Sequence, residues 1–313
     1  MTCCGWKSFM TDDHTPIELS WNWSSKASSP VVRYSVEPIS WRAGTAEDRL
    51  NTTAGPALLG RTLPLSRNLD LQWYRHFLDS LTLRSSELGE DLGKADSSSA
   101  SQTFIAFDLQ EDSVVVKYYF MPSRRAALEQ KSNFELIHSA ISKLALPETY
   151  FAASLDMITE YMGMANESDK LVAEIAAVDC VAPAQSRIKI YVRSRNTTFA
   201  SMLDLMTLGG RLPAFTDANE ASLRELWCAV FGIESDKFSP ADRLPGRDHR
   251  TAGILYYLEL KANSPRPKVK VYLPVRHYAH SDEQIARGLS DFMKRRDKGL
   301  VNRSYYDGVT RLW

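Results

Sequence analysis

The residues from Arg187 to Arg193 alternate strictly between apolar and polar side chains. Ile188, Ile190 and Val192 occupy every second position, and the positions between them hold cations and a tyrosine. Successive side chains of a β-strand point to opposite faces, so this period of two predicts a strand with one apolar face. The polar face is unusual, because lysine, arginine and an aromatic ring are interleaved on it.

The sequence Lys-x-Tyr occurs on three such β-branched runs, which begin at Lys117, Lys189 and Lys270. In each copy the lysine and the tyrosine are two residues apart, so they share one face of the strand. The copies are separated by 72 and 81 residues. Common solenoid repeats have periods of about 20–50 residues. The spacing therefore predicts an internal repeat of a larger supersecondary unit.

The rest of the chain alternates between helical and strand patterns in the recurring order helix, helix, strand, strand. Ser281, with Gln284 three residues later, predicts the start of the last helix. Helical patterns cover residues 67–90, two stretches within 130–165, 199–206, 223–231 and 281–296. The predicted strands cover residues 18–23, 31–37, 104–109, 114–120, 173–181, 187–193, 252–260 and 268–275.

The first strand has a competing interpretation. Thr15 and Glu18, with Pro16 between them, have the spacing of a capping box that begins a helix. No helical apolar stripe follows, whereas Leu19 and Trp21 alternate with polar residues. The pattern therefore favours a strand.

This order of elements restricts the architecture. Consecutive strands joined by short turns pair antiparallel, and the helices between pairs are expected to cover the apolar faces. The Lys/Tyr faces then lie on the other side of the sheet. An open sheet would expose them to solvent, whereas a closed barrel would gather them around one interior. We predict a single α+β domain over residues 1–313.

Composition excludes several classes of protein. Hydrophobic residues make up 44% and charged residues 24%, as in an ordinary soluble domain. The 38 basic and 38 acidic residues cancel, so net charge predicts neither a nucleic-acid nor a membrane partner. There is no apolar run of about 18 residues and no signal-peptide pattern at the start. The four cysteines lack zinc or disulfide spacing. We expect a cytoplasmic protein.

The repeated polar faces suggest a chemistry. Converging lysine and arginine side chains bind phosphate or diphosphate, and tyrosine rings offer negative faces to a cation, worth about 2 kcal/mol or more when desolvated. An allylic diphosphate, which ionises into diphosphate and a carbocation, needs both. A single Lys-x-Tyr is more often a solvated edge face, but three copies together with Arg33 and Arg187 reverse that preference.

A sheet that stacks single-stranded nucleic acid on its tyrosines is a remote alternative. His277 and His280 lack the further ligands of a metal site.

Seven stretches, in order from residue 15 to residue 289, carry a resemblance to a known family. The chain resembles the fungal indole prenyltransferases of the dimethylallyltryptophan synthase type. The stretches are Thr15–Ser20, Val32–Pro38, Val116–Tyr119, Arg187–Arg193, Met206–Arg211, Val271–Tyr278 and Ser281–Leu289.

The resemblance implies a prenyltransferase barrel, in which antiparallel strands are ringed by helices in ααββ repeats. It implies Friedel-Crafts transfer of a dimethylallyl group from dimethylallyl diphosphate to an indole, such as a tryptophan derivative or a tryptophan-containing cyclic dipeptide, in alkaloid biosynthesis. No metal or other cofactor is implied. Glu18 would be the catalytic carboxylate that accepts the indole N–H. Diphosphate would bind Arg33, Lys117, Arg187, Lys189 and Lys270, and Tyr119, Tyr191 and Tyr272 would shield the allylic cation.

Two departures from the family pattern add expectations. Family members extend further at both ends and have five strand pairs, whereas four are recognisable here. We therefore expect an incomplete barrel, open between the strands of Lys270 and Glu18, in which water competes for the cation. A weakly active or inactive relative that still binds these ligands is the alternative function, and a homodimer could supply the missing strands. Phe104 and its neighbours lie near the start of the strand before Lys117, where some tryptophan-C4 enzymes have a lysine base, which argues against C4 alkylation of free tryptophan.

Overall fold

The computed structural model describes residues 6–22, 31–87, 101–144, 151–164, 170–296 and 305–311. Trp23, the last residue of the first predicted strand, lies outside these ranges, as do Cys3 and Cys4. So do the parts of the predicted helices that fall in the gaps.

All eight predicted strands are present, and they form one sheet whose strand order follows the sequence from β1 to β8. The antiparallel α+β architecture expected from the helix and strand pattern is therefore confirmed. The strands are β1 (Ile17–Asn22), β2 (Val31–Val36), β3 (Thr103–Leu109), β4 (Val114–Phe120), β5 (Leu171–Asp179), β6 (Arg187–Ser194), β7 (Ile254–Lys261) and β8 (Lys268–Tyr272).

The strand interpretation of the first segment is confirmed. β1 pairs antiparallel with β2, from Ile17 opposite Val36 to Asn22 opposite Val31. Glu18 therefore lies within an extended segment, and the capping-box alternative is wrong. The apolar side chains of Ile17 and Leu19 are exposed, in contrast to the fully buried apolar face of β6.

The register of the sheet places opposite charges side by side. β2, β3, β4 and β5 pair antiparallel in succession. Arg33 lies directly opposite Asp108, and Lys117 lies directly opposite Asp179. Residues paired in this way have their Cβ atoms about 4.5–5.5 Å apart, so their side chains interact.

The predicted helices are present, although α7 begins six residues earlier than expected and α2 is shorter, and several short helices were missed. Ser281 accepts a hydrogen bond from the Gln284 N–H at the start of α9, as expected. Gly209, three residues after the end of α6, has a left-handed φ of 63°, a conformation that does not continue a helix. The predicted helices are α2 (Gln72–Leu81), α4 (Asn133–Ser142), α5 (Ala152–Met164), α6 (Phe199–Met206), α7 (Asp217–Phe231) and α9 (Asp282–Arg295), and the missed ones are α1 (Ala54–Thr62), α3 (Ser123–Glu129), α8 (Val275–Tyr278) and α10 (Tyr305–Thr310).

The last strand is shorter than expected. The sequence pattern extended it to residue 275, but β8 ends at Tyr272 and α8 begins at Val275. Pro274 lies between them. Proline has no N–H to donate to a sheet and is tolerated at the start of a helix, which explains the change.

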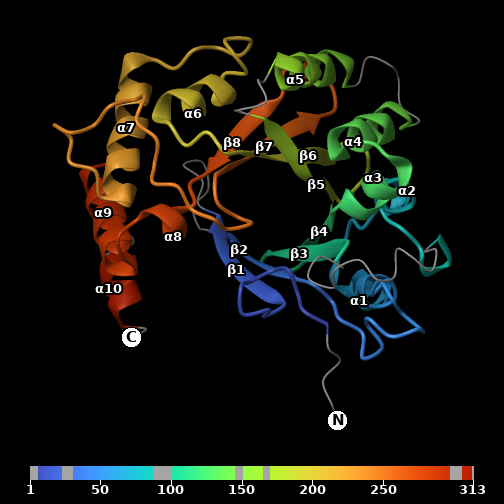
Figure 1. Ribbon diagram of the computed structural model, residues 1–313. Coiled ribbons are helices and arrows are strands. Elements are labelled where there is room, and N and C mark those ends of the chain that lie inside the picture. The colour runs from blue at the N-terminus through green and yellow to red at the C-terminus, as the bar shows by residue number, and fades with distance from the viewer. Residues whose placement is uncertain are drawn as a thin grey trace. The chain divides into compact units, whose positions relative to one another are not determined.

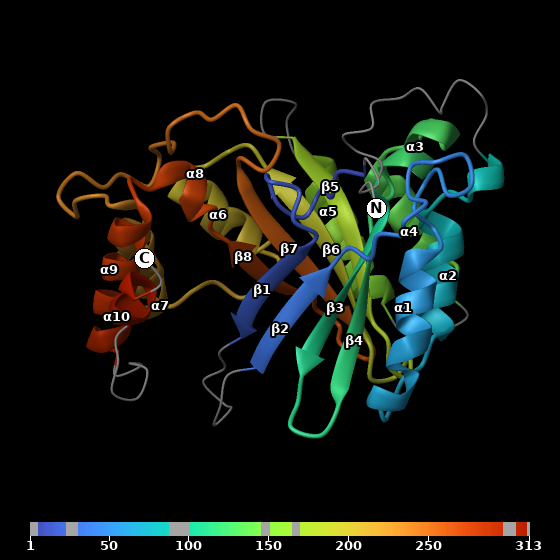
Figure 2. The ribbon, with the colours of Figure 1, turned by 90° about the horizontal axis from the view of Figure 1, so that it is seen from below.

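The chain divides into two compact units, which we describe separately. The first contains Met1–Leu155, Val172–Tyr191 and Leu258–Pro267. In it, α1 and α2 lie along one face of β3 and β4 (Figure 2). Tyr74 and Phe77 of α2 pack against Tyr118 and Phe120 of β4. Helices therefore cover this face of β4, and Lys117 and Tyr119 belong to the opposite face.

The second unit contains Asp156–Leu171, Val192–Tyr257 and Lys268–Trp313. In it, α9 packs against both α7 and α10 (Figure 1). β8 contacts α6 in the same unit.

Candidate active site

The lysines of the first two Lys-x-Tyr copies are buried. Lys117 is 1% exposed and Lys189 is 4% exposed. A buried ammonium group is costly unless it is paired, because water no longer solvates it. The solvated-edge interpretation of these two lysines is therefore wrong, and each must have a compensating partner.

Asp108 on β3 is the partner of Lys117. Its carboxylate accepts hydrogen bonds from the Lys117 Nζ on β4 and from the Arg33 Nε on β2. The Arg33 Nη2 donates to its second oxygen at 3.1 Å, so the arginine contact is bidentate. Burial alone would raise the pKa of Asp108, but the Arg33 hydrogen bond and the Lys117 charge hold it below its ordinary value.

Asp179 on β5 has the same role for the second copy. The Lys189 Nζ donates to one of its oxygens at 2.9 Å, and the Arg187 Nε donates to the other at 2.6 Å. The Arg187 Nη1 also lies 3.2 Å from the Glu259 carboxylate on β7. Burial would raise the pKa of Asp179, but the charges of Lys189, Arg187 and Lys117 lower it.

These seven side chains form what we call the charge cluster. Every member belongs to the first unit. Four cations and three carboxylates leave one net positive charge, so an anion is attracted to the cluster. The cations are Arg33, Lys117, Arg187 and Lys189, and the carboxylates are Asp108, Asp179 and Glu259.

Burial and neighbouring cations make the lysines of the charge cluster easier to deprotonate. Burial, followed by the charges of Lys189 and Arg33, lowers the pKa of Lys117 to about 8, although Asp108 and Asp179 act in the other direction. Burial also lowers the pKa of Lys189, against the effect of Asp179. The arginines stay charged, because the guanidinium pKa is above about 12.

Aromatic rings adjoin the charge cluster. Tyr119 and Tyr191 share strand faces with Lys117 and Lys189, and their ring centroids are 5.9 Å apart. Phe104 lies opposite Tyr119 in the sheet and stacks on it at 4.1 Å. Burial raises the pKa of Tyr119 to about 12, so this phenol is neutral near pH 7. The result is an apolar, electron-rich surface beside an anion-attracting one.

Glu18 lies on β1, directly opposite Ser35. Its side chain is open to solvent. Nevertheless, the protein atoms around the carboxyl group partly desolvate it, and this desolvation raises its pKa above the ordinary value for glutamate. A carboxylate with a raised pKa is a stronger base than a fully solvated one.

The third Lys-x-Tyr copy, in the second unit, has different surroundings. Lys270 is exposed, and its Nζ lies 5.4 Å from the ring centroid of Tyr272 and 5.8 Å from that of Tyr257. The two rings are 6.0 Å apart. Lys270 therefore lies beside two tyrosine rings, one of which belongs to its own motif.

The three carboxylates were not among the residues predicted from the sequence. A signal for them was present, because each strand that precedes a Lys-x-Tyr copy carries an acidic residue near its C-terminal end. Asp108, Asp179 and Glu259 stand 9, 10 and 11 residues before the lysine of the next strand. The first two pair with that lysine, whereas Glu259 pairs with Arg187.

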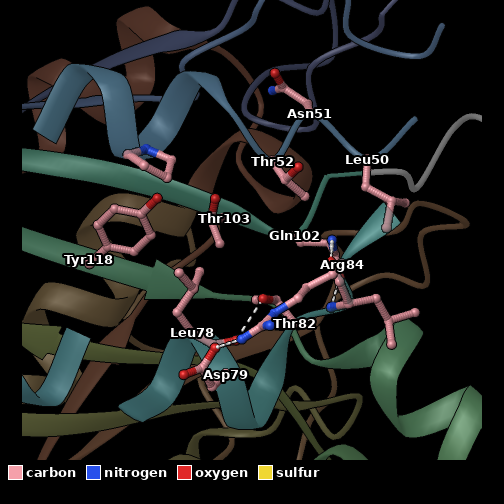
Figure 3. Close-up of a pocket in the computed structure, with 12 residues that line it drawn as sticks. Leu50, Asn51, Thr52, Leu78, Asp79, Thr82, Arg84, Gln102, Thr103 and Tyr118 are labelled. Atoms are coloured by element: carbon pink, nitrogen blue, oxygen red, sulfur yellow. Dashed lines mark hydrogen bonds and ion pairs between the residues drawn. The ribbon is translucent and has the colours of Figure 1, made fainter. Parts of the chain in front are cut away.

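A separate pocket of about 180 Å³ lies on the helix-covered side of β4 (Figure 3). Leu50, Leu78, Thr103 and Tyr118 are among its lining residues. The Tyr118 hydroxyl is buried and has no hydrogen-bond partner among the described residues. Because Tyr118 alternates with Lys117 and Tyr119 along β4, this pocket is on the opposite side of the strand from the charge cluster.

Two features are absent from the described ranges. These ranges contain no cluster of three or more histidine, cysteine or acidic side chains arranged to hold a metal ion. They also contain no helix with the length and apolar character needed to cross a membrane.

Known proteins resemble the chain over nearly its whole length. The model of the family described as tryptophan dimethylallyltransferase matches residues 2–308. A 4-O-dimethylallyl-L-tyrosine synthase of Claviceps purpurea is 50% identical over 98% of this chain and 68% of its own length. A 7-dimethylallyltryptophan synthase of Aspergillus fumigatus is 35% identical over 93% of this chain and 62% of its own length.

Solved structures give the same result for the fold. AnaPT from Neosartorya fischeri superposes with a TM-score of 0.78 at 25% identity, over 94% of this chain and 68% of that one. NotF in complex with brevianamide F and DMSPP has a TM-score of 0.75 at 27% identity, over 94% and 70%. The chain thus spans between about three fifths and seven tenths of the length of these relatives. From its sequence and its fold, the chain belongs to the tryptophan dimethylallyltransferase family.

Proposed function

We propose that this chain transfers a dimethylallyl group from dimethylallyl diphosphate to an aromatic acceptor. The observation that carries the proposal is the charge cluster beside the Tyr119–Tyr191 pair. Cations held in fixed positions suit a diphosphate, and the adjacent rings suit the carbocation that its departure creates. We also assign Lys270 to the proposed diphosphate site and Tyr272 to the proposed cation site, because they share the Lys-x-Tyr motif with the first two copies.

In the proposed reaction, the C–O bond of dimethylallyl diphosphate breaks and both its electrons leave with the diphosphate. Arg33, Lys117, Arg187 and Lys189 stabilise the negative charge that develops there. Prepositioned charges of this kind need no rearrangement at the moment of reaction, so they lower the barrier. The faces of Tyr119, Tyr191 and Tyr272 stabilise the allylic cation and limit the access of water.

The acceptor then attacks the cation and loses one proton. Glu18 is proposed to take that proton, or to polarise the N–H or O–H bond that carries it. Its raised pKa suits a base of this kind, provided that the carboxyl group is ionised. Activity that depends on Glu18 should therefore fall on acidification at a higher pH than for an ordinary glutamate.

Two acceptors are supported by different observations. The seven sequence stretches favour an indole, because they resemble indole prenyltransferases. The relative that is 50% identical is named for O-prenylation of tyrosine, which favours a phenol. Phe104, which stacks on Tyr119, stands where some tryptophan-C4 enzymes have a lysine base. We therefore do not propose C4 alkylation of free tryptophan. We therefore propose an aromatic amino acid or its derivative, with the phenol of tyrosine as the second candidate beside the indole.

The test is incubation of the purified protein with dimethylallyl diphosphate and, separately, L-tyrosine, L-tryptophan and a tryptophan-containing cyclic dipeptide. Mass spectrometry would detect prenylated products, and dimethylallyl alcohol would report reaction with water. We expect one acceptor to be prenylated, with turnover that persists in excess EDTA. Release of diphosphate without any prenylated product would favour the weakly active alternative, and loss of turnover in EDTA restored by Mg²⁺ would contradict the metal-free proposal.

A variant separates the two half-reactions. Glu18→Gln should abolish the prenylated product, while cleavage of dimethylallyl diphosphate to the alcohol continues. Glu111→Gln, an exposed acidic residue after β3, is the matched control. Equal loss of both products in Glu18→Gln would contradict a role confined to the acceptor.

A further inference from the structure

The three carboxylates of the charge cluster occupy an unexpected place, because they neutralise most of the charge of a proposed diphosphate site. We infer that Asp108, Asp179 and Glu259 are positioning residues, which hold the four cations as a preformed anion site before diphosphate binds. The inference rests on the proposed function, since it concerns the same ligand.

The hydrogen-bonding geometry leaves donors for an anion. A lysine ammonium group has three N–H donors, and in the described residues Lys117 and Lys189 each give one to a carboxylate. Arg33 uses Nε and Nη2 on Asp108, and within the described part of the chain its Nη1 hydrogens remain available. Asp108 and Asp179 thus fix the positions of Arg33, Lys117 and Lys189 while donors of these three cations remain for an anion.

The sheet register fixes the carboxylates themselves. Asp108 faces Arg33 across the β2–β3 pair, and Asp179 faces Lys117 across the β4–β5 pair. Asp179 and Glu259 are buried on regular strands, so their positions are set by backbone hydrogen bonds rather than by mobile loops. Functional groups held on strands are positioned more precisely than those on loops.

Electrostatics explains why the cations need these partners. Lys117 is buried and is repelled by Arg33 and Lys189, and these effects already lower its pKa to about 8. Asp108 and Asp179 are the groups that oppose this effect. Without Asp108, the ammonium group would lose its proton at still lower pH, and a neutral lysine attracts an anion much less.

The opposite role makes an opposite prediction. If the carboxylates only neutralised part of the positive charge, which we call dilution, removing one would raise the net charge of the cluster and tighten the binding of diphosphate. The sign of the change in affinity therefore distinguishes positioning from dilution.

The test is calorimetric titration of inorganic diphosphate into the wild-type protein and Asp108→Asn, from pH 6.5 to pH 9. Comparison with wild type at each pH removes the titration of the ligand itself. We expect Asp108→Asn to bind about threefold more weakly at pH 7.5, because lowering the pKa of Lys117 by one further unit from about 8 reduces its protonated fraction at this pH from about 0.8 to about 0.2. The decline of its affinity with rising pH should also begin at lower pH than in wild type.

Further variants guard against a change in folding. Asp108→Glu keeps the charge and should recover most of the affinity. Glu259→Gln removes the carboxylate that contacts Arg187 alone among the cluster cations, and should weaken binding less. Asp112→Asn, in the exposed pair with Arg67, is the control and should bind like wild type.

The outcomes separate the two proposals. If wild type does not bind diphosphate at any pH, the proposed function fails. If wild type binds, but Asp108→Asn and Glu259→Gln bind as tightly or more tightly with an unchanged pH profile, the positioning role is overturned. A lower melting temperature with unchanged affinity would assign the carboxylates to stability alone.

Discussion

Lys117 and Lys189 share a motif with Lys270, but their surroundings differ. The first two are buried and bound to Asp108 and Asp179. Lys270 is exposed and lies near the rings of Tyr257 and Tyr272. The three local sequences are nearly interchangeable, since each places a lysine and a tyrosine on one face of a strand.

The difference teaches that a motif on a strand does not determine the state of its lysine. Burial removes the water that would solvate the ammonium group, so a carboxylate partner becomes necessary. An exposed lysine keeps its water, and its ammonium group can also lie beside aromatic rings. The same three residues can therefore form part of a rigid charge cluster or of an accessible surface.

The largest expected contrast is in stability. Lys189→Ala removes a partner of the buried Asp179, and breaking a buried ion pair typically costs about 3–5 kcal/mol. Lys270→Ala removes an exposed side chain and should change the free energy of unfolding by about 0.5 kcal/mol or less. Urea denaturation of both variants measures the difference. Equal losses would show that burial does not separate the two lysines.

The next contrast is in binding of the donor substrate. Lys117→Ala should weaken binding of dimethylallyl diphosphate by about 1.5–3 kcal/mol, the usual value of a charge-assisted hydrogen bond. Binding of the aromatic acceptor should change far less. Isothermal titration with each ligand provides the measurement. A comparable loss for Lys270→Ala would make Lys270 a full member of the diphosphate site.

A third prediction uses pH to examine the buried lysines. The pKa of Lys117 is about 8 in the folded protein, against an ordinary value of 10.5. Between these values the unfolded chain binds more protons at this position than the folded protein does. The contribution of Lys117 to the free energy of unfolding therefore rises with pH from about 8 to 10.5, by about 3 kcal/mol at 1.36 kcal/mol for each pKa unit.

Denaturation of wild type and Lys117→Met across this window tests the prediction. The rise should be smaller in the variant, because methionine does not titrate. Identical pH dependence in the two proteins would place the pKa of Lys117 near its ordinary value.

The smallest expected effect concerns the exposed copy. Tyr272→Leu removes one ring beside Lys270 and should cost about 0.5–1 kcal/mol of stability, as for exposed cation–π contacts. Tyr272→Phe keeps a ring and should cost less. The free energy of unfolding of both variants is the measurement. A loss of several kcal/mol in either would mean that this copy is packed as tightly as the first two.

The sequence by itself determined the strands, their order and the candidate cations. Period-two alternation is a local property, so Glu18, Arg33, Lys117, Arg187 and Lys189 could be assigned to strand faces directly. Short helices such as α1 and α8 escaped notice, because a few residues give too weak an apolar pattern. Apolar alternation alone predicted that β8 continues to residue 275, whereas the strand ends at Tyr272, before Pro274, which has no N–H to donate to a sheet.

Only the tertiary structure decided which of these charges are buried and what neutralises them. Ion pairs such as Arg33–Asp108 and Arg187–Glu259 join residues 75 and 72 positions apart. Such contacts depend on strand register, which short-range patterns do not specify. Without the register, Asp108, Asp179 and Glu259 are isolated acidic residues in apolar strands, and Lys117 has an ordinary pKa. Burial and pairing are properties of the assembled sheet, because they depend on which atoms exclude water from each charge.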